Sequence, residues 1–81
     1  MVVAEVKIEL KEGVADPEGM NTKKTLKLLG WDVDKVETGK LFEIDLGDNI
    51  SKEEAKKEVE EMCKKLLANP VIQTYDISII D

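Results

Sequence analysis

Few residues in this chain could carry out chemistry. There is no histidine, which removes the most common general base and the most common metal ligand in proteins. The single cysteine, Cys63, could act as a nucleophile only with a neighbouring base and access to solvent. Its helical spacing instead places it on an apolar stripe, so we interpret Cys63 as a buried structural thiol. The residues therefore provide no complete catalytic set.

Two short stretches could be mistaken for ligand sites. The sequence "DVD" at 32–34 offers two carboxylates to a divalent cation, but it lacks the further ligands of a tight site, and a solvated turn is the plainer interpretation. The stretch "KEGVADPEGM" at 11–20 has two glycines, yet neither the GxxxxGK[ST] nor the GxGxxG spacing of a phosphate-binding loop. We interpret this second stretch as the start of a helix.

Composition and charge narrow the class of protein. The chain has 81 residues, of which 42% are hydrophobic and 37% charged, so we expect one globular domain spanning residues 1–81. Its net charge of −6 repels a phosphate backbone, and only Trp31, Phe42 and Tyr75 could stack on bases, so we expect no nucleic-acid partner.

The same composition bears on location. A single cysteine cannot form an intrachain disulfide, which favours a reducing compartment. The N-terminal run "MVVAEVKIEL" is interrupted by charges, unlike the apolar region of a secretory signal. We therefore expect a soluble cytoplasmic protein with no membrane partner.

The first half of the chain predicts a strand followed by a helix. Apolar and charged residues alternate from Val2 to Leu10, as in a half-buried strand. Asp16 suits the N-cap of a helix, Pro17 suits its first position, and Gly30 suits a left-handed cap after Leu29. The residues that we expect to face the sheet from this helix are Thr22, Thr25, Leu26 and Leu29.

The second half predicts a hairpin, a helix and a last strand. A weak strand from Val33 to Thr38, a turn at Gly39 and a firmer strand from Lys40 to Leu46 would form the hairpin. Ser51 with Glu54 has the spacing of a capping box for a second helix, which Asn69 and Pro70 would close. The predicted apolar stripe of this helix consists of Val59, Met62, Cys63, Leu66 and Leu67. The tail at 71–81 alternates again, with Tyr75, Ile77 and Ile79 inward.

This order of elements predicts an α+β fold of the ferredoxin-like kind. It would be a two-layer βαββαβ sandwich, in which a four-stranded antiparallel sheet has two helices on one face. The isoleucine-rich last strand would form an open edge, so we expect a homodimer or higher homo-oligomer that pairs through sheet edges, with a monomer as the alternative. Trp31 would either fold over the edge of the core or contact another subunit.

Several motifs in the chain resemble those of the PurS family, the small subunit of phosphoribosylformylglycinamidine (FGAM) synthase. The most specific is "MCKKLLANPVI" at 62–72, supported by "GVADPEG" at 13–19, "LLG" at 28–30 and "GK" at 39–40. The resemblance runs the length of the chain. It implies a non-catalytic accessory subunit of purine biosynthesis that bridges a synthetase (PurL-type) and a glutaminase (PurQ-type) subunit.

The resemblance also implies where the chemistry takes place. The complex would convert formylglycinamide ribonucleotide (FGAR) to FGAM with glutamine and ATP. ATP and magnesium would be used by the partner synthetase, and this chain would hold no catalytic, cofactor or metal site. The motif positions that could contact partners are Asp16, Pro17, Gly19, Gly39, Lys40, Asn69 and Pro70.

Two alternatives remain open at this point. The residue types at the motif positions are explained more simply by the needs of turns than by contact with partners. Lys40 is the exception, because we expect it to contact a partner or a phosphate. The alternative function is a stand-alone, ferredoxin-like module that senses a small molecule, for which the glycines of "GVADPEG" would suit a binding turn.

Overall fold

The computed structural model describes residues 1–80. Its elements are β1 (Val3–Leu10), α1 (Pro17–Leu28), β2 (Gly39–Asp45), α2 (Lys52–Met62), η1 (Cys63–Leu67, one π-helical turn) and β3 (Gln73–Ile80). Asp81, which the sequence places at the end of the last predicted strand, lies outside the described residues.

The three strands form one antiparallel sheet with β1 at its centre, in the order β2-β1-β3. Val6 of β1 lies opposite Phe42 of β2 and Ile77 of β3. The α+β class is therefore confirmed, but in the described part of the chain the sheet has three strands instead of the predicted four.

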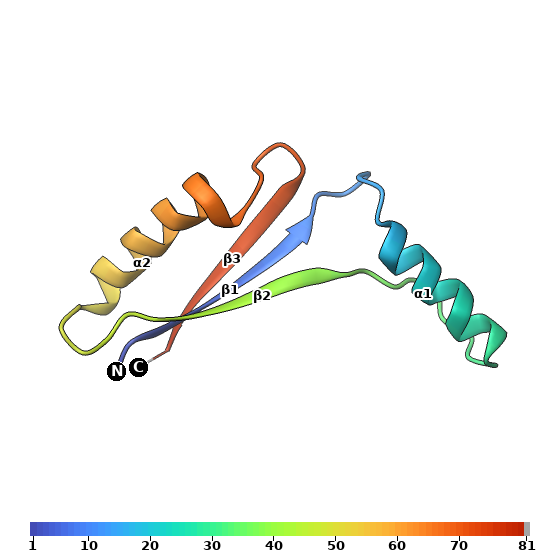
Figure 1. Cartoon of the computed structure of the whole chain (residues 1–81), viewed down its shortest axis with the longest axis horizontal. Coiled ribbons are helices and arrows are strands. Elements are labelled where there is room, and N and C mark those ends of the chain that lie inside the picture. Colours follow the sequence, from blue (N-terminus) through green and yellow to red (C-terminus); the bar gives the residue numbers. More distant parts are fainter. Residues whose placement is uncertain (81) are drawn as a thin grey trace.

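The core lies between this sheet and α2, which packs over β1 and β3 (Figure 1). Alternate residues of β1 point into it, as their sequence pattern predicts, and α2 supplies Val59 with Cys63 following at its end. The buried residues of this core are Ala4, Val6, Ile8, Val59, Cys63 and Ala68. Burying such apolar side chains contributes most of the stability of a small domain.

The second helix begins as predicted but ends differently. Ser51 Oγ accepts a hydrogen bond from the Glu54 amide at 3.1 Å, which confirms Ser51 as the N-cap. After Met62 the helix widens into η1, where the Ala68 amide reaches back to the Cys63 carbonyl. This wider turn changes the helical phase, so Leu66 is 83% exposed and its predicted place on the apolar stripe was wrong.

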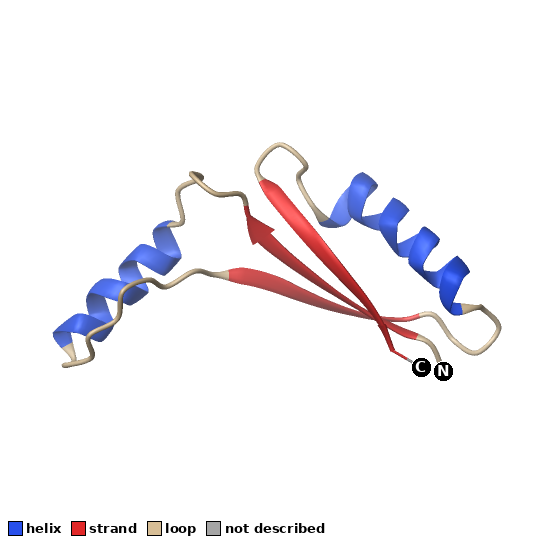
Figure 2. Cartoon of the chain, turned by 180° about the vertical axis from the view of Figure 1, so that it is seen from behind, coloured by secondary structure: helices blue, strands red, loops and turns tan. Residues whose placement is uncertain are grey.

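The first helix lies beyond the end of the sheet, not on its face (Figures 1 and 2). The prediction that both helices back the sheet was therefore wrong, and Thr22, Thr25 and Leu29 are exposed. Because α1 extends past the sheet, the chain is elongated, with extents of 50 × 26 × 14 Å along its three principal axes. Residues 31–38 return along α1 without joining the sheet, so the predicted strand from Val33 to Thr38 is absent.

The predicted hairpin was wrong for the same reason. Gly39 is the first residue of β2 and pairs with Glu9 of β1, and Lys40 pairs with Ile8. The chain is therefore extended at Gly39, and no turn forms there.

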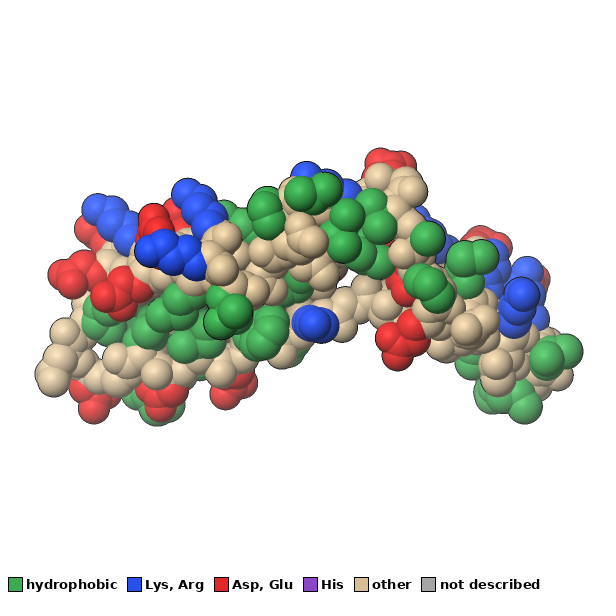
Figure 3. Space-filling model, turned by 45° about the horizontal axis from the view of Figure 1, so that its top comes forward, with side chains coloured by type: hydrophobic (Ala, Val, Ile, Leu, Met, Phe, Trp, Pro, Cys, Tyr) green, Lys and Arg blue, Asp and Glu red, His purple; other side chains and the backbone are tan. Residues whose placement is uncertain are grey.

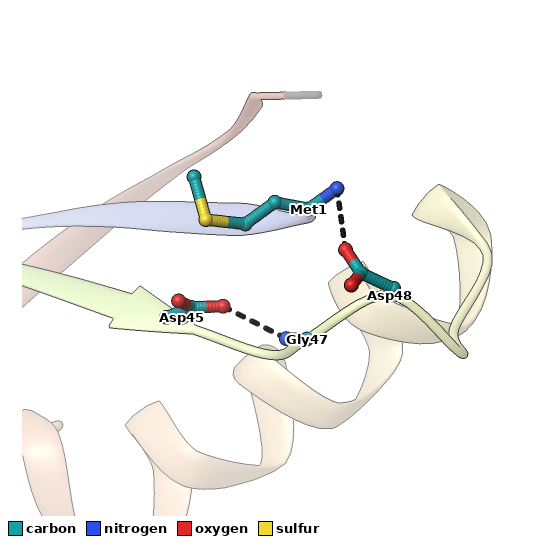
Figure 4. Close-up of polar contacts among 4 residues, drawn as sticks. All are labelled: Met1, Asp45, Gly47 and Asp48. Carbon is teal, nitrogen blue, oxygen red and sulfur yellow. Dashed lines mark hydrogen bonds and ion pairs between the residues drawn. The ribbon is translucent and has the colours of Figure 1, made fainter.

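At the other end of the sheet, a turn links β2 to the region before α2 (Figure 4). Asp45 Oδ1 accepts the Gly47 amide at 2.8 Å, and the α-amino group of Met1 lies 2.7 Å from Asp48 Oδ1. The hydrogen bond and charge of that amino group lower the pKa of Asp48. These contacts join the start of β1 to the turn that precedes α2.

The face of the sheet that α2 does not cover is acidic. Its pairing places Glu5 directly opposite Glu43, and Lys7 lies next to Asp76 across the strands. A charged face of this kind is solvated, as is common for antiparallel sheets with one covered side. Among the described residues, no helix is long and apolar enough to cross a membrane.

Candidate functional site

Asp16 joins α1 to the segment that precedes β2. Its Oδ1 accepts hydrogen bonds from the Gly19 amide at 2.9 Å and the Thr38 hydroxyl at 2.8 Å, and its Oδ2 accepts the Thr38 amide at 2.8 Å. The Thr38 amide, the Gly19 amide and the Thr38 hydroxyl, in that order, lower the pKa of Asp16. The predicted N-cap is confirmed, but the contact with Thr38 was missed because it joins residues 22 positions apart.

Gly19 allows the returning segment to lie directly against α1. A side chain at this buried position would collide with the Val36 carbonyl oxygen and come within 2.7 Å of Asp16 Oδ2. Two of the motif positions therefore have a structural explanation, which is capping for Asp16 and, for Gly19 inside α1, the close approach of the Val36 backbone instead of turn chemistry.

The end of α1 is held by a Schellman turn. Gly30, with a φ of +107°, donates its amide to the Lys27 carbonyl, and the Trp31 amide reaches the Leu26 carbonyl. This confirms Gly30 as the C-terminal cap. Trp31 is 59% exposed, so it does not fold over the core of its own chain.

The Asn69 and Pro70 positions lie in a tightly bonded turn before β3. Asn69 Oδ1 accepts the Val71 amide at 3.0 Å, and Gln73 Oε1 accepts the Asn69 amide at 2.8 Å. Lys11 then donates its Nζ to the Pro70 carbonyl at 2.7 Å and its amide to the Ile72 carbonyl at 2.8 Å. The C-terminal motif thus contacts Lys11, the residue directly after β1. These hydrogen bonds fix the chain at the point where it leaves the sheet and runs toward α1.

A small depression of about 170 Å³ lies at this same junction. Its lining includes Gly39 and Lys40 of β2, Glu18 of α1 and Gln73 of β3. The structure therefore brings together residues from two of the sequence motifs, at 13–19 and 39–40, and Asp16, Asn69 and Pro70 do not line this depression.

A larger depression of about 410 Å³ lies between the 11–15 connection, α1 and the returning segment. Apolar side chains such as Val14, Met20 and Val36 line it together with charged groups. Some of those charges are engaged within the chain, because Lys35 pairs with Glu37 at 3.3 Å and Asp16 accepts three hydrogen bonds. The hydroxyl in this lining, that of Thr38, already donates to Asp16.

Chemistry elsewhere is limited in the described residues. Cys63 is buried, as predicted, and burial followed by the charge of Glu60 raises the pKa of its thiol. Residues 1–80 contain no group of three or more cysteine, aspartate or glutamate side chains placed to hold a metal ion.

What the molecule presents instead is apolar surface. Figure 3 shows hydrophobic side chains between α2 and the β2 edge and again at the far end of the α1 region. Sequence reasoning missed this exposure, because an apolar pattern predicts a buried face without showing what buries it. The large hydrophobic residues that are more than half exposed are Met1, Met20, Leu28, Leu29, Trp31, Leu41, Leu66 and Val71.

The fold and these surfaces define a small α+β protein built for association with other proteins. The sequence profile of the PurS family, described as phosphoribosylformylglycinamidine (FGAM) synthase, matches residues 3–81. The chain belongs to the PurS family of FGAM synthase subunits, which confirms the resemblance of its motifs.

Individual relatives agree with this assignment. The FGAM synthase subunit PurS of Archaeoglobus fulgidus is 61% identical over 77 residues, which cover 94% of this chain and 95% of that protein. The crystal structure of Methanocaldococcus jannaschii PurS is 48% identical and has a TM-score of 0.89, covering 100% of this chain and 98% of that one. A chain of the Thermotoga maritima PurLQS structure, at 20% identity and a TM-score of 0.70, shares the fold, covering 99% of each chain.

Proposed function

We propose that this chain is a non-catalytic accessory subunit that bridges the synthetase and glutaminase subunits of FGAM synthase. The observation that carries the proposal is the family match over residues 3–81, together with relatives that are themselves PurS subunits. In the assembled complex, FGAR, glutamine and ATP would be converted to FGAM in the cytoplasm. ATP and magnesium would be bound by the synthetase.

The described residues support a role in assembly. They hold a buried thiol and an Asp16 carboxylate that already accepts three hydrogen bonds, whereas large apolar side chains are exposed at both ends of the molecule. Exposed apolar patches of this kind mark protein interfaces on soluble proteins.

Reconstitution tests this function directly. Synthetase and glutaminase are mixed with and without the chain, and glutamine-dependent formation of FGAM is measured, with ammonia as an alternative nitrogen source. We expect the glutamine-dependent rate to require the chain and the ammonia-dependent rate of the synthetase to require it less. An unchanged glutamine-dependent rate would remove the proposal.

The proposal includes a homodimer, because the core side of the sheet is only partly covered. Phe42, Ile44 and Leu46 of the β2 side remain half-buried, and α1, which would cover them in a ferredoxin-like fold, lies elsewhere. In a dimer, the exposed side of α1 that carries Leu29 in one copy would cover these half-buried residues of the other copy. We assign the interface to this reciprocal contact, in place of the predicted pairing of sheet edges.

Light scattering combined with size-exclusion chromatography tests the dimer. We expect the wild-type chain to elute as a dimer and Leu29→Gln, which removes apolar area from a 66% exposed position, to shift toward monomer. Leu41→Gln serves as the control, because Leu41 is similarly exposed but lies on the face of the sheet that α2 does not cover. A monomeric wild-type chain contradicts this part of the proposal.

Lys40 is the motif position that we assign to partner contact. It is exposed, it lies opposite Ile8 at the end of the sheet, and it lines the depression shared with Glu18 and Gln73. Lys40→Ala should weaken assembly while leaving the Tm unchanged, because an exposed lysine contributes little to folding.

The second candidate function is the small-molecule sensor. The depression of about 410 Å³ beside the "GVADPEG" turn favours it, because ligand sites are concave and largely apolar. Calorimetry with amino acids and nucleotides on the isolated chain separates the two. Tight binding of one of these, without affinity for the larger subunits, would favour the sensor.

A further inference from the structure

We propose that one face of α1, here called the basic stripe, docks onto an acidic surface of a larger protein subunit that also offers sockets for apolar side chains. The basic stripe consists of Met20, Lys23, Lys24, Lys27, Leu28 and Trp31. The inference rests on the proposed function, since the subunit meant is one of the two larger components of the complex.

The stripe is a continuous surface of the helix. Its members follow the i, i+3, i+4, i+7 spacing of one helix face, and Met20 with the three lysines borders a shallow depression of about 280 Å³. Met20 is 59% exposed and Leu28 is 87% exposed. Trp31 extends the stripe past the helix end, where the Schellman turn fixes its backbone.

Apart from Met20 and Lys23, which also line the depression of about 410 Å³, the stripe is separate from the other surfaces of α1. Gly19 and Leu26 lie on the side that packs against residues 31–38. Leu29, whose side of α1 is assigned above to a second copy, lies with Thr22 and Thr25 about half a helical turn away from the centre of the stripe. Both contacts can therefore form while the stripe remains open to a third surface.

The charge of the stripe is opposite to that of the rest of the chain. The α1 helix has three lysines and one glutamate, a net charge of +2 in a chain of −6, so the remaining residues carry −8. In the described part of the chain these three lysines have no ion pair. Screening at physiological salt acts over about 8 Å. Across a molecule 50 Å long, the distant carboxylates of the sheet therefore do not cancel the field of the stripe.

The combination of groups points to a protein surface. A tryptophan and a leucine beside lysines can fill apolar sockets while the lysines meet carboxylates around them, which is how anchors and rims are arranged at protein interfaces. A membrane or a nucleic acid has no fixed apolar pockets for these two side chains, whereas a folded subunit can place apolar pockets and carboxylates side by side.

Charge neutralisation with a matched control tests the inference. The triple variant Lys23→Gln/Lys24→Gln/Lys27→Gln is compared with Lys56→Gln/Lys57→Gln/Lys64→Gln, which changes the net charge equally on the exposed side of α2 and η1. Binding to immobilised synthetase and to immobilised glutaminase is measured at several salt concentrations. We expect the stripe variant to bind one subunit about tenfold more weakly with a flatter salt dependence, and the control to bind as the wild type does.

A second variant examines the apolar part. Leu28→Gln should also weaken binding, but it should keep the salt dependence of the wild type. Circular dichroism of each variant checks that the helices remain. Equal weakening in the stripe variant and its control would overturn the inference, because net charge alone would then explain the loss.

Other outcomes separate this inference from the function on which it rests. If the wild-type chain binds neither larger subunit, both fail. If it binds and the stripe variant binds equally well, only the inference fails.

A stripe variant that loses self-association but keeps its affinity for the larger subunits would assign the stripe to a second copy. Sedimentation of the wild-type chain, but not the variant, with phosphatidylserine vesicles would assign it to a membrane. Either result overturns the proposal.

Discussion

Thr38 donates both its amide and its hydroxyl to the carboxylate of Asp16, each at 2.8 Å, although 22 positions separate the two residues. The same carboxylate caps α1 through the Gly19 amide. One side chain thereby starts the helix and holds the returning chain beside it. This contact is one of the interactions that hold α1 in place beyond the sheet, because α1 makes no extensive contact with the strands.

Removing the carboxylate should release the returning segment. In Asp16→Ala, the amides of Gly19 and Thr38 lose their acceptor, so we expect faster hydrogen exchange in residues 31–38 with unchanged exchange in β1. Asp16→Asn should have a smaller effect, since one oxygen still accepts hydrogen bonds. Equal acceleration throughout the chain would show that the contact supports the whole fold instead.

Acid should have a similar local effect. The pKa of Asp16 is lower in the folded chain than its ordinary value of 3.8, so the unfolded state binds more protons in the interval between the two values. The stabilisation by Asp16 is therefore complete above about pH 3.8 and is lost as the pH falls through the folded-state pKa. Trp31 fluorescence should report this transition, and the transition should be absent in Asp16→Asn.

Gly19→Ala should destabilise the chain even though alanine favours helices. The added methyl group would collide with the Val36 carbonyl and lie 2.7 Å from Asp16 Oδ2. Overpacking of this kind costs about 1–3 kcal/mol, more than the helix propensity of alanine returns. Urea denaturation measures the change. Asn21→Ala, at an exposed position of the same helix, should be neutral or slightly stabilising, and a matching loss there would contradict the steric explanation.

The uncovered face of the sheet should accept a stabilising charge change. Glu5 and Glu43 lie directly opposite each other, and like charges in that arrangement are unfavourable. Glu43→Lys should therefore raise the free energy of unfolding by about 0.2–1 kcal/mol at low salt, with less gain at high salt. Glu12→Lys makes the same charge change on an exposed loop, so an equal gain there would show that only net charge matters.

Cys63 should be unreactive in the folded chain. Its side chain is fully buried and burial raises the pKa of the thiol, so little thiolate is available to react. Labelling with a thiol reagent should be slow under native conditions and fast in denaturant. Rapid native labelling would mean that η1 opens frequently.

Local signals in the sequence were sufficient for much of the fold. The alternation from Val2 to Leu10 predicted β1 and its buried side, and the caps at Asp16, Gly30 and Ser51 were all confirmed. Each of these depends on a residue and its neighbours within a few positions, so each is written in a short stretch of sequence. The family motifs were recognisable for the same reason.

Only the tertiary structure decided where α1 lies and what residues 31–38 do. An apolar pattern on a helix shows that a face will be covered, but it does not show whether the cover is the same chain's sheet or another surface. The contact of Thr38 with Asp16 and the fit of Val36 against Gly19 hold that segment beside α1 and out of the sheet. The widened turn at Cys63–Leu67 likewise turned Leu66 outward against its sequence pattern. Contacts between residues distant in the sequence carry no local signature, which is why the structure was needed to find them.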